Sequence, residues 1–121
     1  MTFQHQQLAE GRWFELPFME QLANVGSEVE RTISWRKKGN GEYSALAFDR
    51  ALELIDLTLQ DPRNRMYPRL KEVARVREAL ADYFVGENQY GSTDELWQKY
   101  FYAFSLAAQM ARHGRVIKAK I

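Results

Sequence analysis

Apolar residues recur at every third or fourth position through four long segments of this chain, and glycine or proline stands between the segments. In the first segment, Phe18, Leu22, Val25, Val29 and Ile33 have the spacing of one face of an α-helix. The other three segments follow the same rule. The pattern predicts an irregular arm over 1–16, helices at about 17–38, 42–60, 68–85 and 93–113, and a basic tail over 114–121.

The connections between these helices are short, which constrains how they pack. Gly39-Asn40-Gly41 is a tight turn, so the first two helices are expected to be antiparallel neighbours. Each helix has a similar length, about 27–33 Å at ~1.5 Å per residue. Matched lengths and short loops favour one all-α domain over 1–121, an antiparallel up-down-up-down four-helix bundle with an irregular N-terminal arm.

The fourth segment begins with the sequence Ser92-Thr93-Asp94-Glu95. This pattern is typical of a capping box, in which the Ser92 hydroxyl accepts the Glu95 N–H and the Glu95 carboxylate accepts the Ser92 N–H. Gly114 predicts the end of the helix, because glycine favours the left-handed residue that commonly follows a helix.

Composition narrows the classes of function. Seventeen Lys and Arg residues against sixteen Asp and Glu residues give a net charge of +1, which by itself points to no acidic partner. The chain has no cysteine, which excludes disulfides, thiolate catalysis and cysteine-zinc sites. No run approaches the roughly 18 apolar residues that span a membrane. We therefore expect no cofactor, no membrane partner and, by default, a cytoplasmic location.

Basic residues gather in two stretches, 63–77 and 112–120, that antiparallel packing brings to the same end of the bundle. This end is a candidate site for an anionic macromolecule, nucleic acid included, because the guanidinium group suits phosphate and carboxylate recognition. The alternative is that these side chains are solvated and paired with neighbouring acids. The candidate anion-binding residues are Arg63, Arg65, Arg69, Arg75, Arg112 and Arg115.

The fourth helix is apolar around almost its whole circumference, which is typical of a helix buried on more than one side. Tyr102, Leu106 and Met110 lie largely outside its main apolar face. We expect them to form the interface of a homodimer or of a complex with another protein. The alternative is that the N-terminal arm covers them, with Trp13 and Phe14 packing back onto the bundle.

Three acids of the second helix form the only arrangement suggestive of a metal site. Asp49, Glu53 and Asp56 share one helix face, and Glu53-x-x-Asp56 resembles half of the magnesium motif of all-α nucleotide pyrophosphohydrolases. The E-x-x-E motif expected on the preceding helix is missing, because Glu28 and Glu30 have the wrong spacing. The alternative is an ordinary solvent-facing side of a helix, so no metal is expected.

Two arginines lie beside the predicted core. Arg50 borders the apolar face of the second helix, and Arg77 follows Val76 in the third. We expect each to be partly buried and paired with an acid of a neighbouring helix, such as Glu28 or Glu30.

Two stretches carry a resemblance to known proteins: RTISWRKKGNGEYSALAFDRALELIDLTLQD and STDELWQKYFYAFSLAAQMAR. Over roughly residues 12–112 the chain resembles a family of small prokaryotic helical proteins that has no established activity and so implies no functional residues. At fold level it is similar to the bundles of the ribosomal intervening-sequence family and of HEPN-type companion proteins. Active HEPN nucleases carry an R-x4-6-H motif, which neither His5 nor His113 completes.

These observations lead to one functional interpretation and one alternative. The interpretation is a non-enzymatic helical bundle that binds a partner, with the arginine-rich end as its anion site. The alternative is a nucleotide-processing or nucleotidyltransferase-associated protein that uses the carboxylates of the second helix.

Overall fold

The computed structural model describes residues 11–66 and 68–120, with side chains as far as Gly114. The described residues are helical or irregular and contain no strand. The predicted all-α, four-helix fold is confirmed. The elements are the 3-10 turn η1 (Arg12–Glu15), α2 (Phe18–Lys37), α3 (Gly41–Gln60), the 3-10 turn η2 (Pro62–Asn64), α4 (Arg69–Phe84) and α5 (Asp94–Lys120).

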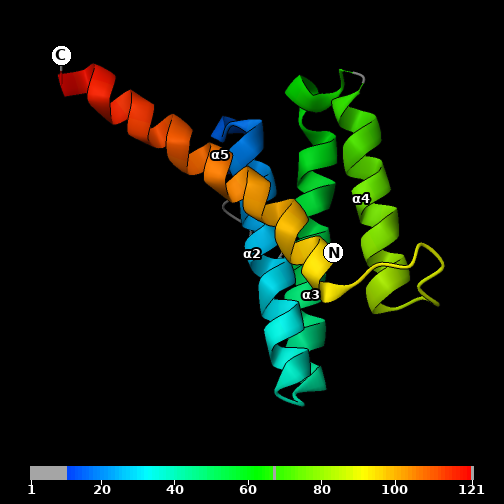
Figure 1. Cartoon of the computed structure of the whole chain (residues 1–121). Helices are drawn as coiled ribbons and strands as arrows, with labels where there is room; N and C mark the ends of the chain where they lie inside the picture. Colours follow the sequence, from blue (N-terminus) through cyan, green and yellow to red (C-terminus); the bar gives the residue numbers. More distant parts are fainter. Residues whose placement is uncertain (1–10, 67, 121) are drawn as a thin grey trace.

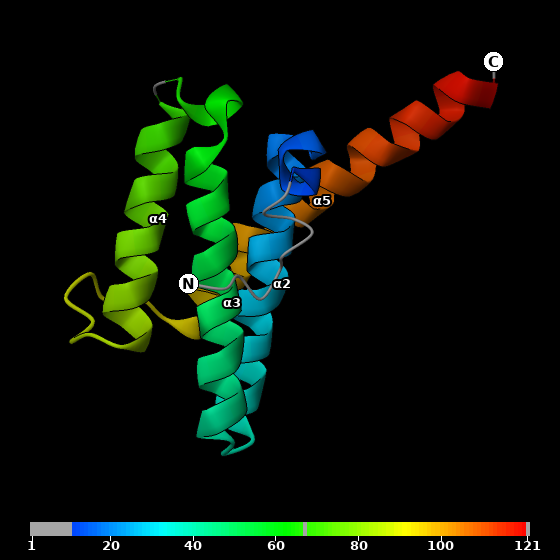
Figure 2. The same ribbon diagram turned by 180° about the vertical axis from the view of Figure 1, so that it is seen from behind.

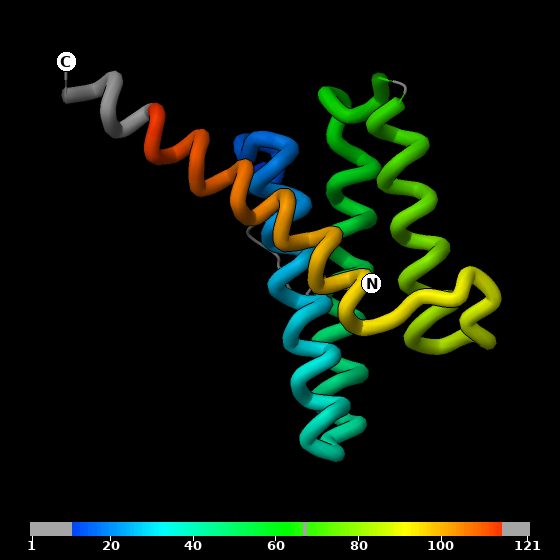
Figure 3. The backbone as a smooth tube through the Cα atoms, in the orientation of Figure 1, coloured from blue at the N-terminus to red at the C-terminus, as the bar shows by residue number. Residues whose placement is uncertain are grey.

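Helix α2 is the centre of the assembly. It packs against α3 on one side and against α5 on another, while α4 packs on α3 (Figure 1). Seen from behind, α5 crosses α2 obliquely and its C-terminal half extends past the other helices (Figure 2). The connection from α4 to α5 passes around the side of the bundle to reach the start of α5 (Figure 3). The projecting half of α5 therefore lies outside the compact body formed by α2, α3 and α4.

The turn between α2 and α3 forms as the sequence predicts. Gly39 adopts a φ of 79°, a left-handed conformation that a side chain would strain. The side-chain oxygen of Asn40 then accepts the N–H of Tyr43 at 2.9 Å, which satisfies one of the free N–H groups at the start of α3. The two helices therefore run antiparallel from this turn.

The core follows the predicted helical pattern. All five apolar residues singled out in the first helix are buried, together with Phe48 and Ile55 of α3. Leu52 and Leu59, also expected in the α3 stripe, are only partly buried. The remaining buried apolar residues of α3 and α4 are Ala47, Ala51, Leu54, Leu57, Val73, Val76 and Leu80.

Both ends of α5 differ from the prediction. The hydroxyl of Thr93, not that of Ser92, accepts a helix N–H, from Leu96 at 3.1 Å. The N–H of Ser92 is donated instead to the side-chain oxygen of Asn88 at 2.8 Å. At the other end the helix continues through Gly114 to Lys120, so the prediction of a separate basic tail over 114–121 is wrong for 114–120. Glycine inside a helix costs only about 1 kcal/mol, and no proline follows to end it. Residue 121 lies outside the described residues.

The described part of the N-terminal arm is η1. Trp13 is buried, as the sequence predicts, and Phe14 is partly buried against the core. The arm residues 1–10 lie outside the described residues. The turn η1 packs against α3, where Trp13 bonds to Thr58, and it is joined to α2 by a hydrogen bond from Gln21.

Candidate functional site

One side of α5 is exposed along its middle turns. Trp97, Phe101, Phe104 and Ala108 occupy the opposite side, where they are buried or packed against the core. The predicted interface residues repeat every four positions on the outer side. Tyr102 is 65% exposed, Leu106 43% and Met110 66%. The structure thus places the three candidates together in one apolar row, which we call the α5 stripe.

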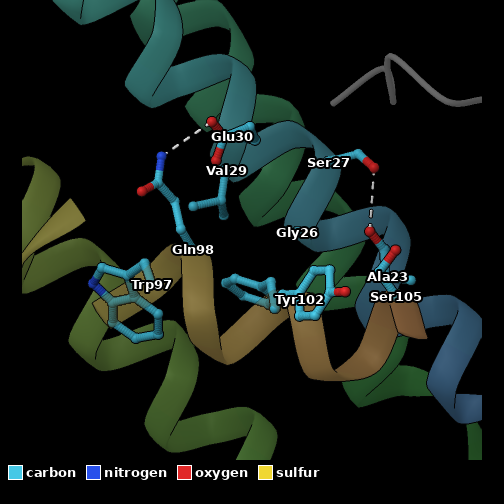
Figure 4. Close-up of a pocket in the computed structure, with 10 residues that line it drawn as sticks. Ala23, Gly26, Ser27, Val29, Glu30, Trp97, Gln98, Tyr102 and Ser105 are labelled. Atoms are coloured by element: carbon cyan, nitrogen blue, oxygen red, sulfur yellow. Dashed lines mark hydrogen bonds between the residues drawn. The ribbon is translucent and has the colours of Figure 1, made fainter. Parts of the chain in front are cut away.

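A shallow groove of about 220 Å³ lies between α2 and α5 beside the stripe (Figure 4). Tyr102 and Ser105 line its α5 side, and small residues, among them Ala23 and Ser27, line its α2 side. Gln98 donates a hydrogen bond across the helix pair to Glu30 Oε1 at 3.1 Å. The groove is therefore continuous with the α5 stripe through Tyr102.

Within the lining of the groove, α2 and α5 approach very closely at Gly26. A Cβ atom added to Gly26 would lie 2.6 Å from the Cβ of Phe101, which is closer than real contacts allow. Phe101 is buried at this crossing. Trp97 lies one turn before it, and its Nε1 is buried without a hydrogen-bond partner among the described residues. That nitrogen lies on the edge of the ring away from Tyr102, so it does not point into the groove (Figure 4).

Three of the six candidate anion-binding arginines meet around the start of α2. Arg63 Nη2 donates to the backbone oxygen of Leu16 at 2.6 Å. The guanidinium of Arg69 lies over the Phe18 ring, 4.7 Å from its centroid. Arg112 forms an ion pair with Glu20 at 3.4 Å. Each of these three arginines therefore already contacts a group of its own chain.

The other three candidates do not join them. Arg65 is exposed on the loop after η2. Arg75 lines a separate groove, in which the Tyr100 hydroxyl donates to Glu72 Oε2 at 2.8 Å. Burial raises the pKa of Tyr100, and that hydrogen bond raises it further. The side chain of Arg115 lies outside the described residues. A common site for all six arginines, and anion binding by it, therefore stay predictions.

The carboxylates of α3 are not arranged for metal binding. Asp56 Oδ1 accepts a hydrogen bond from Arg77 Nε at 2.7 Å, in an ion pair that is partly exposed on both sides. Asp49 is exposed and Glu53 partly buried. In residues 11–66 and 68–120, no group of three histidines, aspartates or glutamates is placed to hold an ion. Asp49, Glu53 and Asp56 are only weak candidates for metal ligands, and the expectation of no metal stays a prediction.

The two arginines beside the core do pair with acids of neighbouring helices. Arg50 Nε lies 3.3 Å from Glu28 Oε2, which is one of the partners the sequence suggests. Arg77 pairs with Asp56 rather than with Glu28 or Glu30, because α4 packs on α3 and not on α2.

A buried polar network that the sequence pattern does not predict joins η1, α2, α3 and η2. Trp13 Nε1 donates to Thr58 Oγ1 at 3.1 Å. The side-chain amide nitrogen of Gln21 donates to the backbone oxygen of Trp13 at 3.0 Å and to Asp61 Oδ2 at 2.8 Å. The side-chain oxygen of Gln21 accepts a hydrogen bond from Asn64 at 2.8 Å. All five residues are fully buried. Because buried polar groups are costly unless satisfied, this network fixes the arm and the α3–α4 connection in place.

Asp61 is the charged centre of that network. Burial alone would raise the pKa of its carboxyl group, but hydrogen bonds from Arg63 and Gln21 outweigh burial and lower the pKa below its usual range. Arg63 Nη2 lies 2.7 Å from Asp61 Oδ2, and the Arg63 N–H donates to Oδ1 at 2.9 Å. Asp61 therefore stays ionised at neutral pH.

A second polar cluster ties three helix ends together. Asp94, at the start of α5, accepts hydrogen bonds from Arg36 and, at 2.5 Å, from the Tyr83 hydroxyl. Burial would raise the pKa of Asp94, yet the bonds from Arg36 and Tyr83 lower it. Burial and the bond to Asp94 raise the pKa of Tyr83. The cluster is a structural junction between α2, α4 and α5.

Comparison of the chain with protein-family models, with curated proteins and with solved structures gives no match. The resemblance carried by residues 12–112 therefore stays a prediction. In the described residues, every helix is too short or too polar to cross a lipid bilayer.

Proposed function

We propose that this chain is a non-enzymatic helical bundle that binds a protein partner through the α5 stripe, in the simplest case a second copy of itself. The observation that carries the proposal is the exposure of Tyr102, Leu106 and Met110 in a single row on a long helix. Contiguous exposed apolar surface typically marks a protein interface, and twofold dimers are the commonest way to cover it.

The charged groups that are most buried support a binding role over a catalytic one. Glu28 pairs with Arg31 and Arg50, Asp61 with Arg63, and Asp94 with Arg36. Each carboxylate is thus occupied by an arginine of its own chain, in contacts that join or end helices. The nucleotide-processing alternative needs Asp56 as a metal ligand, whereas Arg77 occupies that carboxylate.

Replacing Leu106 with Glu tests the proposal. In the monomer the residue is 43% exposed, so a glutamate there stays hydrated and the helical fold survives. In a dimer the same charge would be desolvated without a partner, which costs several kcal/mol. A loss of about 3 kcal/mol corresponds to a dissociation constant raised by roughly 100-fold or more. Analytical ultracentrifugation measures association, and circular dichroism measures retention of the helices.

Leu46→Glu is the matched control. Leu46 is a leucine of α3 with almost the same exposure, 41%, and it lies outside the α5 stripe. We expect this variant to associate like the unmodified chain. If the unmodified chain sediments as a monomer at high micromolar concentration, self-association through the stripe is wrong. The same conclusion follows if both glutamate variants weaken association equally.

We propose anion binding as a second activity, supported by the convergence of Arg63, Arg69 and Arg112 on residues 16–20. The double change Arg69→Glu and Arg112→Glu should weaken binding of a single-stranded oligonucleotide by more than about 10-fold at low salt, because phosphate contacts dominate such affinities. The matched change Lys37→Glu and Lys38→Glu should have little effect. Fluorescence anisotropy over a salt series measures the oligonucleotide affinity of both double variants. Equal losses would mean that the arginine-rich end is not a site.

A further inference from the structure

The charge along α5 is strongly polarised. Residues 112–120 contain four basic residues and no acid: Arg112, Arg115, Lys118 and Lys120. Two exposed acids lie toward the other end of the helix, Glu95 in its first turn and Glu30 of α2, which is bonded to Gln98. The sequence of α5 is thus purely basic over 112–120, whereas residues 94–111 carry two acids, Asp94 and Glu95, and one base, Lys99.

The C-terminal part of α5 extends beyond the other helices. Among the residues with described side chains, Arg112 makes the last ion pair from α5 to the body, with Glu20. Beyond it the helix continues away from α2, α3 and α4 (Figures 1 and 2). In proteins most of the stability of a helix comes from tertiary packing of its apolar face. Packing against another helix would stabilise this one.

From these features we infer that a second copy of the chain packs antiparallel along α5, with Leu106 of both copies at the twofold axis. This arrangement rests on the proposed function and specifies the direction and register in which the two α5 helices pack. Tyr102 and Met110 lie four residues before and after Leu106, so each Tyr102 faces Met110 of the second copy. An isologous twofold interface pairs residues in this reciprocal manner.

Electrostatics favours this direction over the parallel one. Parallel packing would place the four basic residues of 112–120 against their own copies, and like charges in contact are repulsive. Antiparallel packing brings that basic end toward Glu95 and Glu30 of the second copy. It also opposes the two helix dipoles, each positive at its N-terminus and negative at its C-terminus.

The groove between α2 and α5 gives the second copy a place to insert a side chain. Tyr102 lines that groove, so Met110 of the second copy would lie beside its 220 Å³ volume. Methionine is unbranched and flexible, and it fills irregular apolar spaces well. The second copy thus contributes a residue to a surface that is open in the single chain.

Single cysteines test the geometry against a clean background, because the chain has no cysteine of its own. In the antiparallel dimer Leu106→Cys should form an intermolecular disulfide with itself. Tyr102→Cys and Met110→Cys should each fail to cross-link alone, since eight residues at ~1.5 Å separate the equivalent positions by about 12 Å, beyond the ~7 Å limit between Cα atoms. A subunit-exchanged mixture of these two variants should cross-link, giving a band of twice the monomer mass on non-reducing electrophoresis.

Leu46→Cys is the control for random collision and should stay uncross-linked. If Tyr102→Cys and Met110→Cys each cross-link alone as efficiently as Leu106→Cys, the packing is parallel and the inference is wrong, although binding through the stripe stands. If no variant cross-links while the chain sediments as a dimer, the antiparallel geometry is also wrong, and self-association itself stands. A chain that sediments as a monomer overturns the proposed self-association itself.

Discussion

Substituting valine for Gly26 is expected to lower the free energy of unfolding by about 3 kcal/mol or more, which is the upper part of the range for overpacked cores. The added Cβ would lie 2.6 Å from the Cβ of Phe101, an atom fixed by the α5 backbone. The clash cannot be relieved by a rotamer change, so α5 must move away from α2. Urea denaturation followed by circular dichroism measures the loss, which corresponds to roughly 10 °C in Tm.

Gly41→Ala separates this steric effect from the general cost of replacing glycine in a helix. Gly41 begins α3, and a Cβ there would meet no atom within 4 Å. We expect this control to be neutral or slightly stabilising, because alanine favours the helix over glycine by up to about 1 kcal/mol. A Gly26→Val variant as stable as the control would show that the close crossing of α2 and α5 is absent in solution.

Removing the carboxylate of Asp61 should have a comparable effect, a loss of about 3 kcal/mol at neutral pH. Asp61→Ala leaves the amide of the buried Gln21 without one acceptor and the guanidinium of Arg63 without its ion pair. Arg63 is 47% exposed, so solvent screens its share, and most of the loss comes from the buried hydrogen bonds. Equilibrium denaturation of the variant and the unmodified chain measures the difference.

The pH dependence of that difference has a defined sign. The folded-state pKa of Asp61 is lowered relative to the unfolded chain. Its ionisation therefore contributes stability that is fully present above the unfolded pKa of ~3.9 and is lost as the pH falls through the lower folded value. The difference in the free energy of unfolding between the unmodified chain and Asp61→Ala should be constant from pH 5 to 8. It should become smaller below about pH 4. A gap that widens in acid would contradict the ionised, paired carboxylate.

Periodicity alone predicted most of the fold, because helix formation and core burial depend on the same residues. Phe18, Leu22 and Val25 are buried since their three- and four-residue spacing places them on one side of α2. The same reasoning applied to α5 located the exposed row of Tyr102, Leu106 and Met110. A helix with more apolar residues than one face can hold is recognised from the sequence directly, because the excess depends only on neighbouring residues.

The buried polar network was missed although a weak signal was present. Gln21, Glu28 and Thr32 repeat with Val25 at spacings of three and four, so they form a second buried row on α2 beside the apolar one. A polar residue in such a row either lies at the solvated edge of the apolar face or is buried with its hydrogen bonds made within the protein. Only the position of Trp13, Asp61 and Asn64 decides between these, and contacts across 40 or more residues are not encoded locally.

The arginine-rich end shows a different limit of sequence reasoning. Antiparallel packing predicted that the stretches 63–77 and 112–120 would lie at the same end of the bundle. It did not indicate that Arg63 would be held by Asp61, Arg69 by Phe18 and Arg112 by Glu20. A count of charges predicts an electrostatic potential, whereas the pairing of each side chain depends on orientations within a few ångströms.

The position of α2 between α3 and α5 has a consequence for the order in which the chain assembles. The three-residue turn after α2 lets α2 and α3 meet at little entropic cost, since few residues need to be ordered to close the loop. The Trp13–Thr58 bond spans 45 residues in sequence, yet once α2 and α3 are paired its two partners are already held near each other. The Arg36–Asp94 bond spans 58 residues and must wait for α4 and the connection after it. We therefore expect α5, the helix that carries the exposed stripe, to dock last and to be accessible to a second chain until it has docked.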